Sequence, residues 1–217
     1  MLSLIDISKS FGPLRVLDSV TMHVDKGEIV AIVGPSGAGK TTLLQIAGTL
    51  SLPDSGTVTY DGVEVTGLPD RKLSDFRNSH IGFVFQSHQL LSEFSACENV
   101  ALPAMIAGVS RRKAMGSAAS LLRDLGLEHR LTHRPAEMSG GERQRAAIAR
   151  ALINSPGVIF ADEPTGSLDS ANRDEVMAAI RRMREERGQT FVIVTHDPAM
   201  AAVADRTVRM ADGRIIE

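Results

Sequence analysis

One stretch of the sequence places glycines, a lysine and a threonine at the spacing that binds the phosphates of a nucleotide. Residues 34–41 read GPSGAGKT and match the pattern G-x-x-x-x-G-K-[ST] at every fixed position. Glycines let consecutive backbone N–H groups turn toward phosphate oxygens with no Cβ in the way. Lys40 adds a positive charge for the β- and γ-phosphates, and the Thr41 hydroxyl can ligate Mg²⁺. The sequence therefore predicts a nucleoside triphosphate site. Its residues are Gly34, Pro35, Ser36, Gly37, Ala38, Gly39, Lys40, Thr41 and Thr42.

The segments on either side of this loop are of the kind that the chemistry requires. Residues 28–33 form a short, β-branched and nearly all-apolar run, which predicts a buried parallel strand. Residues 42–47 continue as a helix, whose first N–H groups would face the phosphates. An ordinary glycine-rich turn is the alternative, and this strand–loop–helix setting argues against it.

Three other apolar runs end in polar residues that suit the same site. Asp162 ends one of them, and an Asp at the tip of an apolar strand opposite a phosphate loop is where Mg²⁺ is held. The adjacent Glu163 is a candidate general base for an attacking water. Gln86 and His196 end the other two runs, and the carboxyl ends of strands form the ligand side of an open α/β sheet. The three predicted strands are residues 81–85, 158–161 and 191–195.

A second glycine-bearing motif, MSGGERQR at residues 138–145, predicts an exposed helix N-terminus. Ser139 and Glu142 have the spacing of a capping box. Gly140 and Gly141 leave the first N–H groups of this helix unshielded, which suits an anion. Capping alone would explain the serine and the glutamate. Two glycines are costly for a helix that only needs to be stable, so we interpret the motif as functional.

Composition narrows the class of protein. The 217 residues carry a net charge of −2, which provides no overall basic field for nucleic acid. Aromatic residues make up 4% of the chain and Trp is absent, which argues against stacking on single strands. Cys97 is the only cysteine, so no internal disulfide forms, and a small buried hydrophobe is its expected role. The uncharged stretch 99–110 contains a proline and is too short to span a bilayer.

The remaining patterns predict an α/β domain with two additional parts. Residues 2–24 alternate between apolar and polar, which predicts antiparallel strands beside the nucleotide-binding core. Residues 87–153 are poor in β-branched runs and show helical spacing, which predicts a helical insertion. Phe11 lies upstream of the phosphate loop, where it would either stack on a purine ring or pack inside the hairpin. The pattern alone leaves both open.

The ordered set of motifs resembles the ATPases of the ABC transporter family along essentially the whole chain. The set is GPSGAGKT, Gln86, MSGGERQR, VIFADE, SLD and His196. The resemblance implies a P-loop NTPase (RecA-like) core with an antiparallel β subdomain and an inserted α-helical subdomain. On this view residues 1–217 form a single ABC ATPase domain. Its core would comprise residues 1–86 and 154–217, and its helical subdomain residues 87–153.

The same resemblance implies the ligands and the roles of the site residues. ATP and Mg²⁺ would bind, with Thr41, Gln86 and Asp162 around the metal. Glu163 would polarise water and His196 would contact the γ-phosphate. Gln86 would also link the nucleotide to a membrane partner. Phe11 occupies the base-stacking position, where Tyr is usual in the family, and Met138 replaces the usual Leu.

The family also forms head-to-tail homodimers that enclose two ATP molecules. This arrangement implies that one copy presents Ser139, Gly140 and Gly141 to the phosphate loop of the other copy. Asp169, in the SLD motif, would then lie at the dimer seam.

Two segments resemble the ATPases of lipoprotein-releasing transporters, namely residues 85–100 and 133–137. ADEPTGSLD at residues 161–169 is shared more widely with the ATPases of macrolide exporters and cell-division complexes, which stay as alternatives. Ser92 stands where Pro is usual, and Cys97 where Leu is usual. The lipoprotein-releasing group implies two copies of this subunit that power permease subunits from the cytoplasmic face of the bacterial inner membrane. ABC ATPases that act on nucleic acid would need a coiled-coil insertion, a second cassette or a basic face, and P-loop kinases lack MSGGERQR.

The apolar residues between 90 and 104, which include Leu91 and Phe94, have two interpretations. They would either be buried in the domain or line an apolar groove for a short helix of the permease.

Overall fold

The alternating pattern near the N-terminus forms the predicted hairpin. In the computed structural model, which describes residues 1–216, alternate residues of this hairpin, such as Leu2, Leu4 and Val20, are buried on one face. Two further short strands extend it into an antiparallel sheet of order β2-β1-β4-β5. These strands are β1 (Leu2–Phe11), β2 (Leu14–Val24), β4 (Ser55–Tyr60) and β5 (Val63–Glu64).

The apolar runs form a second, central sheet of order β10-β9-β3-β8-β7-β6. Five of its six strands are parallel, and β10 is antiparallel to β9. The predicted strands are confirmed, so their carboxyl ends meet at one edge. The strands are β3 (Ile29–Val33), β6 (Ile81–Phe85), β7 (Val158–Asp162), β8 (Thr190–Val194), β9 (Arg206–Ala211) and β10 (Arg214–Ile215).

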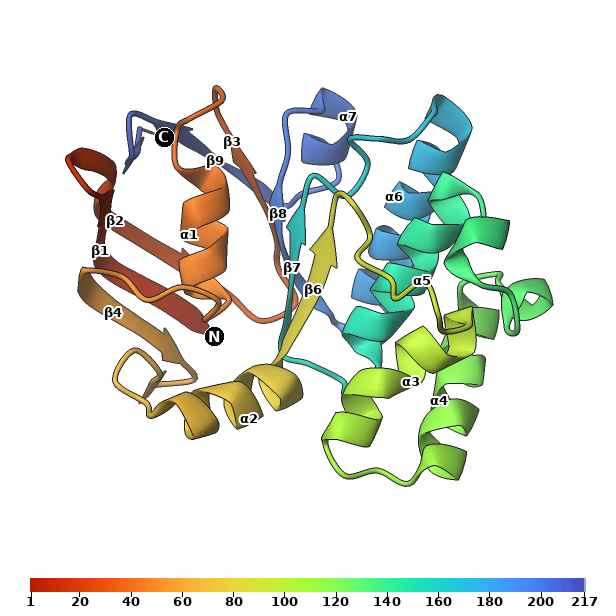
Figure 1. Cartoon of the computed structure of the whole chain (residues 1–217). Coiled ribbons are helices and arrows are strands. Elements are labelled where there is room, and N and C mark those ends of the chain that lie inside the picture. Colours follow the sequence, from red (N-terminus) through yellow and green to blue (C-terminus); the bar gives the residue numbers. More distant parts are fainter. Residues whose placement is uncertain (217) are drawn as a thin grey trace.

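The inner strands β3, β7 and β8 bury both of their faces, which explains why their sequences are almost continuously apolar. On β8, Val192 and Val194 join a core with α1 (Lys40–Ala47) and the antiparallel sheet. Phe191 and Ile193 point to the other face and join a core with the helices. Figure 1 shows α1 between the two sheets, and the group of helices labelled α3, α4, α5 and α6 on the other side of the central sheet.

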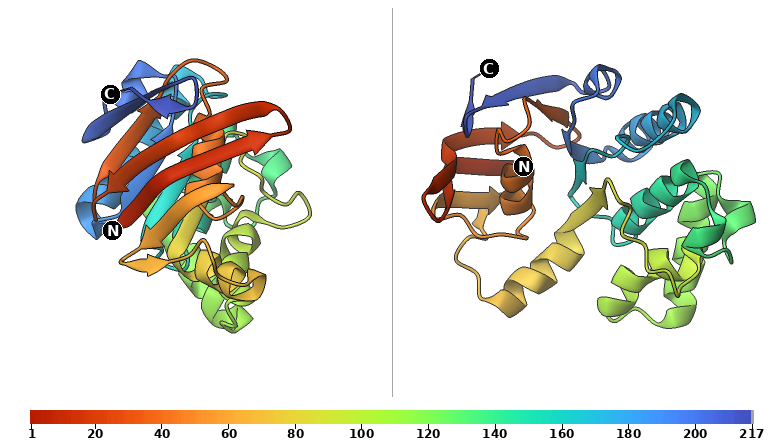
Figure 2. Two further views of the ribbon diagram at one scale, coloured as in Figure 1. Left: turned by 90° about the vertical axis from the view of Figure 1, so that its left-hand side faces the viewer. Right: turned by 45° about the horizontal axis from the view of Figure 1, so that its top comes forward.

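The predicted helical insertion is present as three helices and two single 3₁₀ turns between residues 96 and 152. Figure 2 shows these helices gathered at one end of the molecule, away from the antiparallel sheet. The helices are α3 (Ala96–Ile106), α4 (Arg111–Asp124) and α5 (Gly140–Leu152). Outside the insertion lie α2 (Asp70–His80), α6 (Ser170–Arg187) and α7 (Pro198–Ala201).

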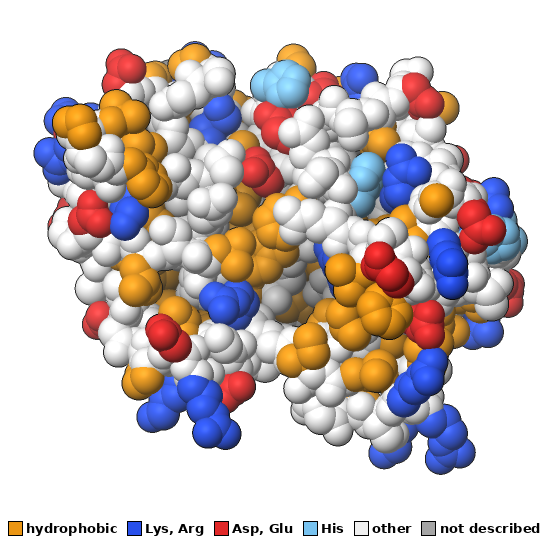
Figure 3. Space-filling view, viewed as in Figure 1, with side chains coloured by type: hydrophobic (Ala, Val, Ile, Leu, Met, Phe, Trp, Pro, Cys, Tyr) orange, Lys and Arg blue, Asp and Glu red, His pale blue; other side chains and the backbone are white. Residues whose placement is uncertain are grey.

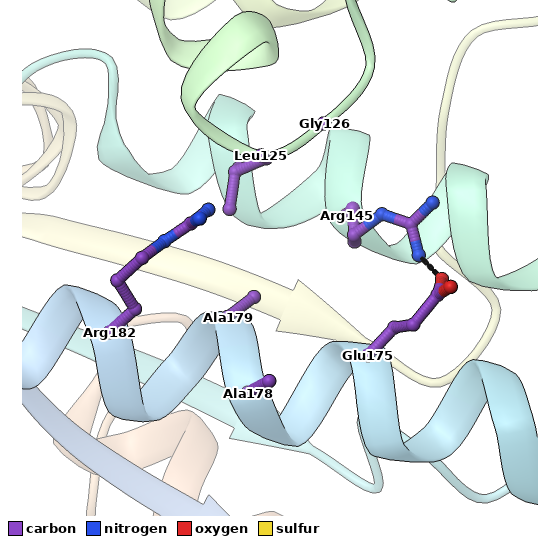
Figure 4. A pocket seen from close by; sticks show the side chains of 7 residues that line it. All are labelled: Leu125, Gly126, Arg145, Glu175, Ala178, Ala179 and Arg182. Carbon is purple, nitrogen blue, oxygen red and sulfur yellow. Dashed lines mark hydrogen bonds and ion pairs between the residues drawn. The ribbon is translucent and has the colours of Figure 1, made fainter.

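Polar contacts join the insertion to α6. Arg145 of α5 pairs with Glu175 of α6 at the side of a cavity of about 360 Å³ (Figure 4). Nη2 of Arg187, at the end of α6, donates to Oδ2 of Asp124 in α4 at 2.7 Å. These contacts place α5 beside the core, with its N-terminus toward the loop that precedes α6.

Candidate active site

The phosphate loop lies between β3 and α1, as the sequence predicts. Gly39 precedes the helix with φ of 91°, and a Cβ built there would lie 2.7 Å from the Val16 carbonyl oxygen. Any other residue would be strained in this conformation and would collide with β2. Nζ of Lys40 donates to the carbonyl oxygens of Gly34 at 2.9 Å and Pro35 at 2.8 Å. The loop therefore holds the ammonium group above its own turn, where a phosphate would take over these contacts.

Thr41 and Asp162 meet across the site, although they are 121 residues apart in the chain. Oγ1 of Thr41 donates to Oδ1 of Asp162 at 3.3 Å. Burial raises the pKa of Asp162 above its ordinary value, and the hydrogen bond from Thr41 opposes that rise. A half-buried carboxylate beside a hydroxyl gains from a bound cation, so the pair fits a hard metal ion with oxygen ligands. Within residues 1–216, no three His, Cys, Asp or Glu side chains gather as a complete metal site.

Glu163 is held in an unusual backbone conformation directly after Asp162. Its φ is 48°, which is uncommon for a residue with a side chain, and such strain gathers at functional sites. Its backbone N–H donates to the Val194 carbonyl oxygen at 2.9 Å, which ties the turn to β8. Oε1 of Glu163 lies 2.7 Å from Nδ1 of His196, and Oε2 accepts the His196 backbone N–H at 3.4 Å. The glutamate side chain is 17% exposed and the histidine side chain 70% exposed, so the pair faces solvent at the edge of the sheet.

One cavity of about 550 Å³ joins most of the predicted residues. Gln86 lines it from the end of β6, near Gly166. The lining also includes Leu14 and Val16 of β2, which were not predicted. Their alternating pattern identified a strand, but nothing in it indicated which side chains would face a nucleotide. The predicted residues on the lining are Gly34, Ser36, Gly37, Ala38, Gly39, Lys40, Thr41, Thr42, Gln86, Asp162, Glu163 and His196.

Phe11 is not a core residue of the hairpin, so that alternative is wrong. Its side chain is 55% exposed at the end of β1, and Nζ of Lys9 lies 5.6 Å from its ring centroid. The ring does not line the cavity of the phosphate loop. It is free to contact a ligand, and stacking on a base stays a prediction.

The second glycine motif starts α5 with the predicted capping box. Oγ of Ser139 accepts the Glu142 N–H at 3.2 Å, and Oε2 of Glu142 accepts the Ser139 N–H at 2.7 Å. The serine hydroxyl keeps its own hydrogen for another acceptor, and Ser139 is exposed. Neither Ser139, Gly140, Gly141 nor Asp169 lines the cavity that holds the phosphate loop of the same chain.

Gly141 has a packing role that the sequence did not reveal. A Cβ at this position would lie 2.0 Å from Oδ1 of Asn172, in the first turn of α6. The same Asn172 donates Nδ2 to both carboxylate oxygens of Asp169, at 3.0 and 2.9 Å, and Asp169 caps α6. The start of α5 therefore packs directly on the loop that carries Asp169.

Comparison with known proteins now decides the family. The sequence profile described as ABC transporter matches residues 17–166. The chain belongs to the ABC transporter family. The ATPases of this family bind and hydrolyse ATP.

Curated relatives match this ABC ATPase over its full length. The lipoprotein-releasing system ATP-binding protein LolD of Bacteroides fragilis is 56% identical over 216 residues, which cover 100% of both chains. The protein of the same name from Syntrophotalea carbinolica is 55% identical over 219 residues, covering 99% of this chain and 96% of the relative.

Solved structures confirm the fold of the ABC ATPase. The dimeric structure of MJ0796, a bacterial ABC transporter cassette, has a TM-score of 0.92 at 37% identity and covers 100% of this chain and 97% of that one. A dimeric post-hydrolysis state of MJ0796 bound to ADP and Pi has a TM-score of 0.91, with the same identity and coverage. Among residues 1–216, no helix combines the length and hydropathy that a membrane span requires.

Proposed function

We propose that this ABC ATPase powers the release of lipoproteins from the bacterial inner membrane. The observation that carries the proposal is the 56% identity, over the whole length of both chains, to a lipoprotein-releasing ATPase. The subunit would work as a head-to-tail homodimer at the cytoplasmic face, bound to permease subunits. Macrolide-exporter and cell-division complexes use related ATPases and are the alternatives that the experiment below must reject.

The proposed chemistry uses the residues gathered at the carboxyl edge of the central sheet. Thr41 and Asp162, with Gln86 nearby, would hold Mg²⁺, which neutralises charge on the β- and γ-phosphate oxygens. Lys40 leaves its two loop carbonyls and binds the phosphates. Glu163 orients a water and takes its proton on the carboxylate. His196 holds that carboxylate through the 2.7 Å contact and reaches the γ-phosphate from the open side.

The proposed homodimer gives a role to four predicted site residues that do not line the phosphate-loop cavity of their own chain. Ser139, Gly140 and Gly141 are presented at the start of α5, and we propose that they bind the nucleotide held by the partner. The free hydrogen of the Ser139 hydroxyl and the first N–H groups of α5 would donate to the γ-phosphate. Asp169, packed beside them through Asn172, would lie at the seam.

For the permease we propose a groove on the face shown in Figure 3, hollowed between α2 and α3 and floored by β6 and the end of α5. Its volume is about 410 Å³. Pro103, from the stretch 90–104, lines it, whereas Leu91 and Phe94 do not. Both are exposed outside it, at 43% and 37%. We propose that the helical subdomain, residues 87–153, forms one side of this surface and that α2 and β6 of the core form the other. The apolar lining includes Phe83, Phe85, Pro103, Ile106, Ala151 and Ile153.

The test is to purify the tagged subunit from detergent-solubilised membranes and to identify the integral membrane proteins that accompany it. The purified complex is then placed in proteoliposomes that hold a labelled lipoprotein. ATP-dependent release of the lipoprotein to an added acceptor is the expected result. A complex that contains a permease of the macrolide-exporter or cell-division type, and that releases no lipoprotein, would reject the proposal.

A further inference from the structure

The chain adopts a strained turn immediately after Gln86. His88 and Gln89 have φ of 61° and 49°, two consecutive residues with side chains in the left-handed region. This region disfavours residues that carry a Cβ, and neither residue is glycine. The turn therefore needs support from its surroundings to keep this shape.

Arg150 of α5 supplies that support. Its Nη2 donates to the His88 carbonyl oxygen at 2.9 Å and its Nη1 to the Gln89 carbonyl oxygen at 2.5 Å. One planar guanidinium thus binds both strained residues, each through a different nitrogen of its fixed fork. The guanidinium is half-buried, and burial lowers its pKa from the ordinary value. The two hydrogen bonds to carbonyl oxygens offset part of the cost of burying this charge.

The same helix holds the chain on the other side of Gln86. Nε2 of Gln144 donates to the Phe85 carbonyl oxygen at 3.4 Å. Gln86 therefore sits between two positions that are fastened to α5, while its side chain points into the cavity of the phosphate loop. The helix that fastens them is the one that begins at the Ser139 capping box. A displacement of α5 would move the main chain on both sides of Gln86.

We propose that Arg150 is a positioning residue for Gln86. By holding the His88–Gln89 turn, it sets where the Gln86 side chain lies relative to the nucleotide, and it links that position to α5. This inference rests on the proposed role of Gln86 at the nucleotide. If Arg150 merely stabilised the fold, its loss would affect ATP turnover independently of Gln86.

A double-mutant cycle separates the two cases. The wild type, Arg150→Met, Gln86→Ala and the double variant are compared as purified full-length proteins for kcat and KM with ATP. We expect Gln86→Ala and Arg150→Met each to lower kcat by about tenfold, the size of one lost charge-assisted contact. The double variant should be no slower than Gln86→Ala alone, because Arg150 acts through Gln86. Arg150→Lys, which offers a single donor nitrogen in place of two, should have an intermediate kcat.

Arg77→Met is the matched control. Arg77 is also half-buried and lines the same groove, but its Nη1 donates to the Thr49 carbonyl oxygen at 2.5 Å and not to the turn after Gln86. Its kcat should stay at the wild-type value. Multiplicative losses in the double variant, or an unchanged kcat in a folded Arg150→Met protein, would overturn the proposal. If Gln86→Ala itself turned over ATP normally, the role of Gln86 would be wrong and the positioning role of Arg150 would fall with it. Thermal unfolding shows whether each variant is folded. If Arg150→Met is unfolded, Arg150→Lys takes its place in the double-mutant cycle with Gln86→Ala.

Discussion

At the scale of single residues, Glu163 shows most directly how the fold prepares chemistry. Its left-handed backbone is kept in place by the bond to the Val194 carbonyl, and its carboxylate by His196. The preceding residue, Asp162, also carries a carboxylate, but this one accepts a hydrogen bond from Thr41. Two adjacent carboxylates therefore point to different partners, which allows one to serve a metal and the other to serve a water.

Glu163→Gln should keep ATP binding and lower ATP turnover by roughly 10²–10⁴-fold, the usual scale for a positioned general base. The amide retains the shape and the contact with His196 but takes no proton. Turnover is measured with the purified permease complex, and ATP binding by calorimetry on the subunit. Glu175→Gln is the control, since Glu175 is 58% exposed and pairs with Arg145 outside the site. A Glu163→Gln complex with near-normal turnover would show that another group activates the water.

At the scale of elements, the start of α5 depends on one carboxylate. Glu142 is 9% exposed, and it accepts the Ser139 N–H together with Nε of Arg130 at 2.8 Å and Nε2 of His129 at 3.3 Å. Burial alone would raise the pKa of Glu142, but the hydrogen bonds from Arg130 and Ser139 prevail and lower it from 4.5 to about 2. The ionised form is therefore the one that the folded protein prefers.

The pH dependence follows from the sign of this shift. Because the pKa is lower in the folded state, Glu142 contributes stability above pH 4.5, and this contribution is lost as the pH falls through about 2. The full contribution is about 3 kcal/mol. Glu142→Gln should lower the free energy of unfolding at pH 7, and its deficit relative to the wild type should shrink steadily between pH 4.5 and 2.

Urea unfolding at several pH values measures this difference. Glu128→Gln serves as the control, because Glu128 is 72% exposed and its pair with Arg123 is a surface contact of small value. A deficit of Glu142→Gln that is the same at pH 3 and pH 7 would mean that the loss comes from the amide NH2 group, which cannot accept these hydrogen bonds, and not from the missing charge.

At the scale of the whole molecule, two separate cores place the functional parts. One core joins α1 to the antiparallel sheet, and the other joins the central sheet to α3–α6. The nucleotide cavity lies at the carboxyl edge of the central sheet, and the proposed permease groove opens between α2 and α3. Gln86 and Gln89 lie within one turn of each other, one on the cavity and the other on the groove.

A charge placed in the groove should therefore disrupt the complex without affecting the nucleotide site. Ile106 is 70% exposed on the groove, and Ile106→Asp should abolish copurification of the permease while ATP binding by the isolated subunit stays intact. Val63→Asp, at a 55% exposed position on β5, is the matched control and should copurify normally. Normal copurification of Ile106→Asp would mean that the permease does not bind in this groove. Phe94→Asp would then test whether the permease binds the exposed side chain outside it.

Much of this protein is determined by short contiguous stretches of its sequence. The phosphate loop and the Ser139–Glu142 capping box are local structures, whose hydrogen bonds join residues a few positions apart, so their sequences suffice to predict them. The buried strands can also be predicted from the sequence, because a parallel strand that is covered on both faces must be apolar along its length. The last two strands were missed, since β9 alternates apolar residues with arginines and β10 has only two residues.

Only the tertiary structure decided which distant residues share a contact. Gly141 is required by Asn172, which approaches it from another helix, and Arg150 binds carbonyl groups 61 and 62 residues away. Leu14 and Val16 line the cavity of the phosphate loop because β2 passes beside Gly39. None of these contacts leaves a periodicity or a local spacing in the sequence. Each depends on how the helical insertion and the antiparallel sheet pack on the central sheet, and packing at that range is set by the whole of both cores.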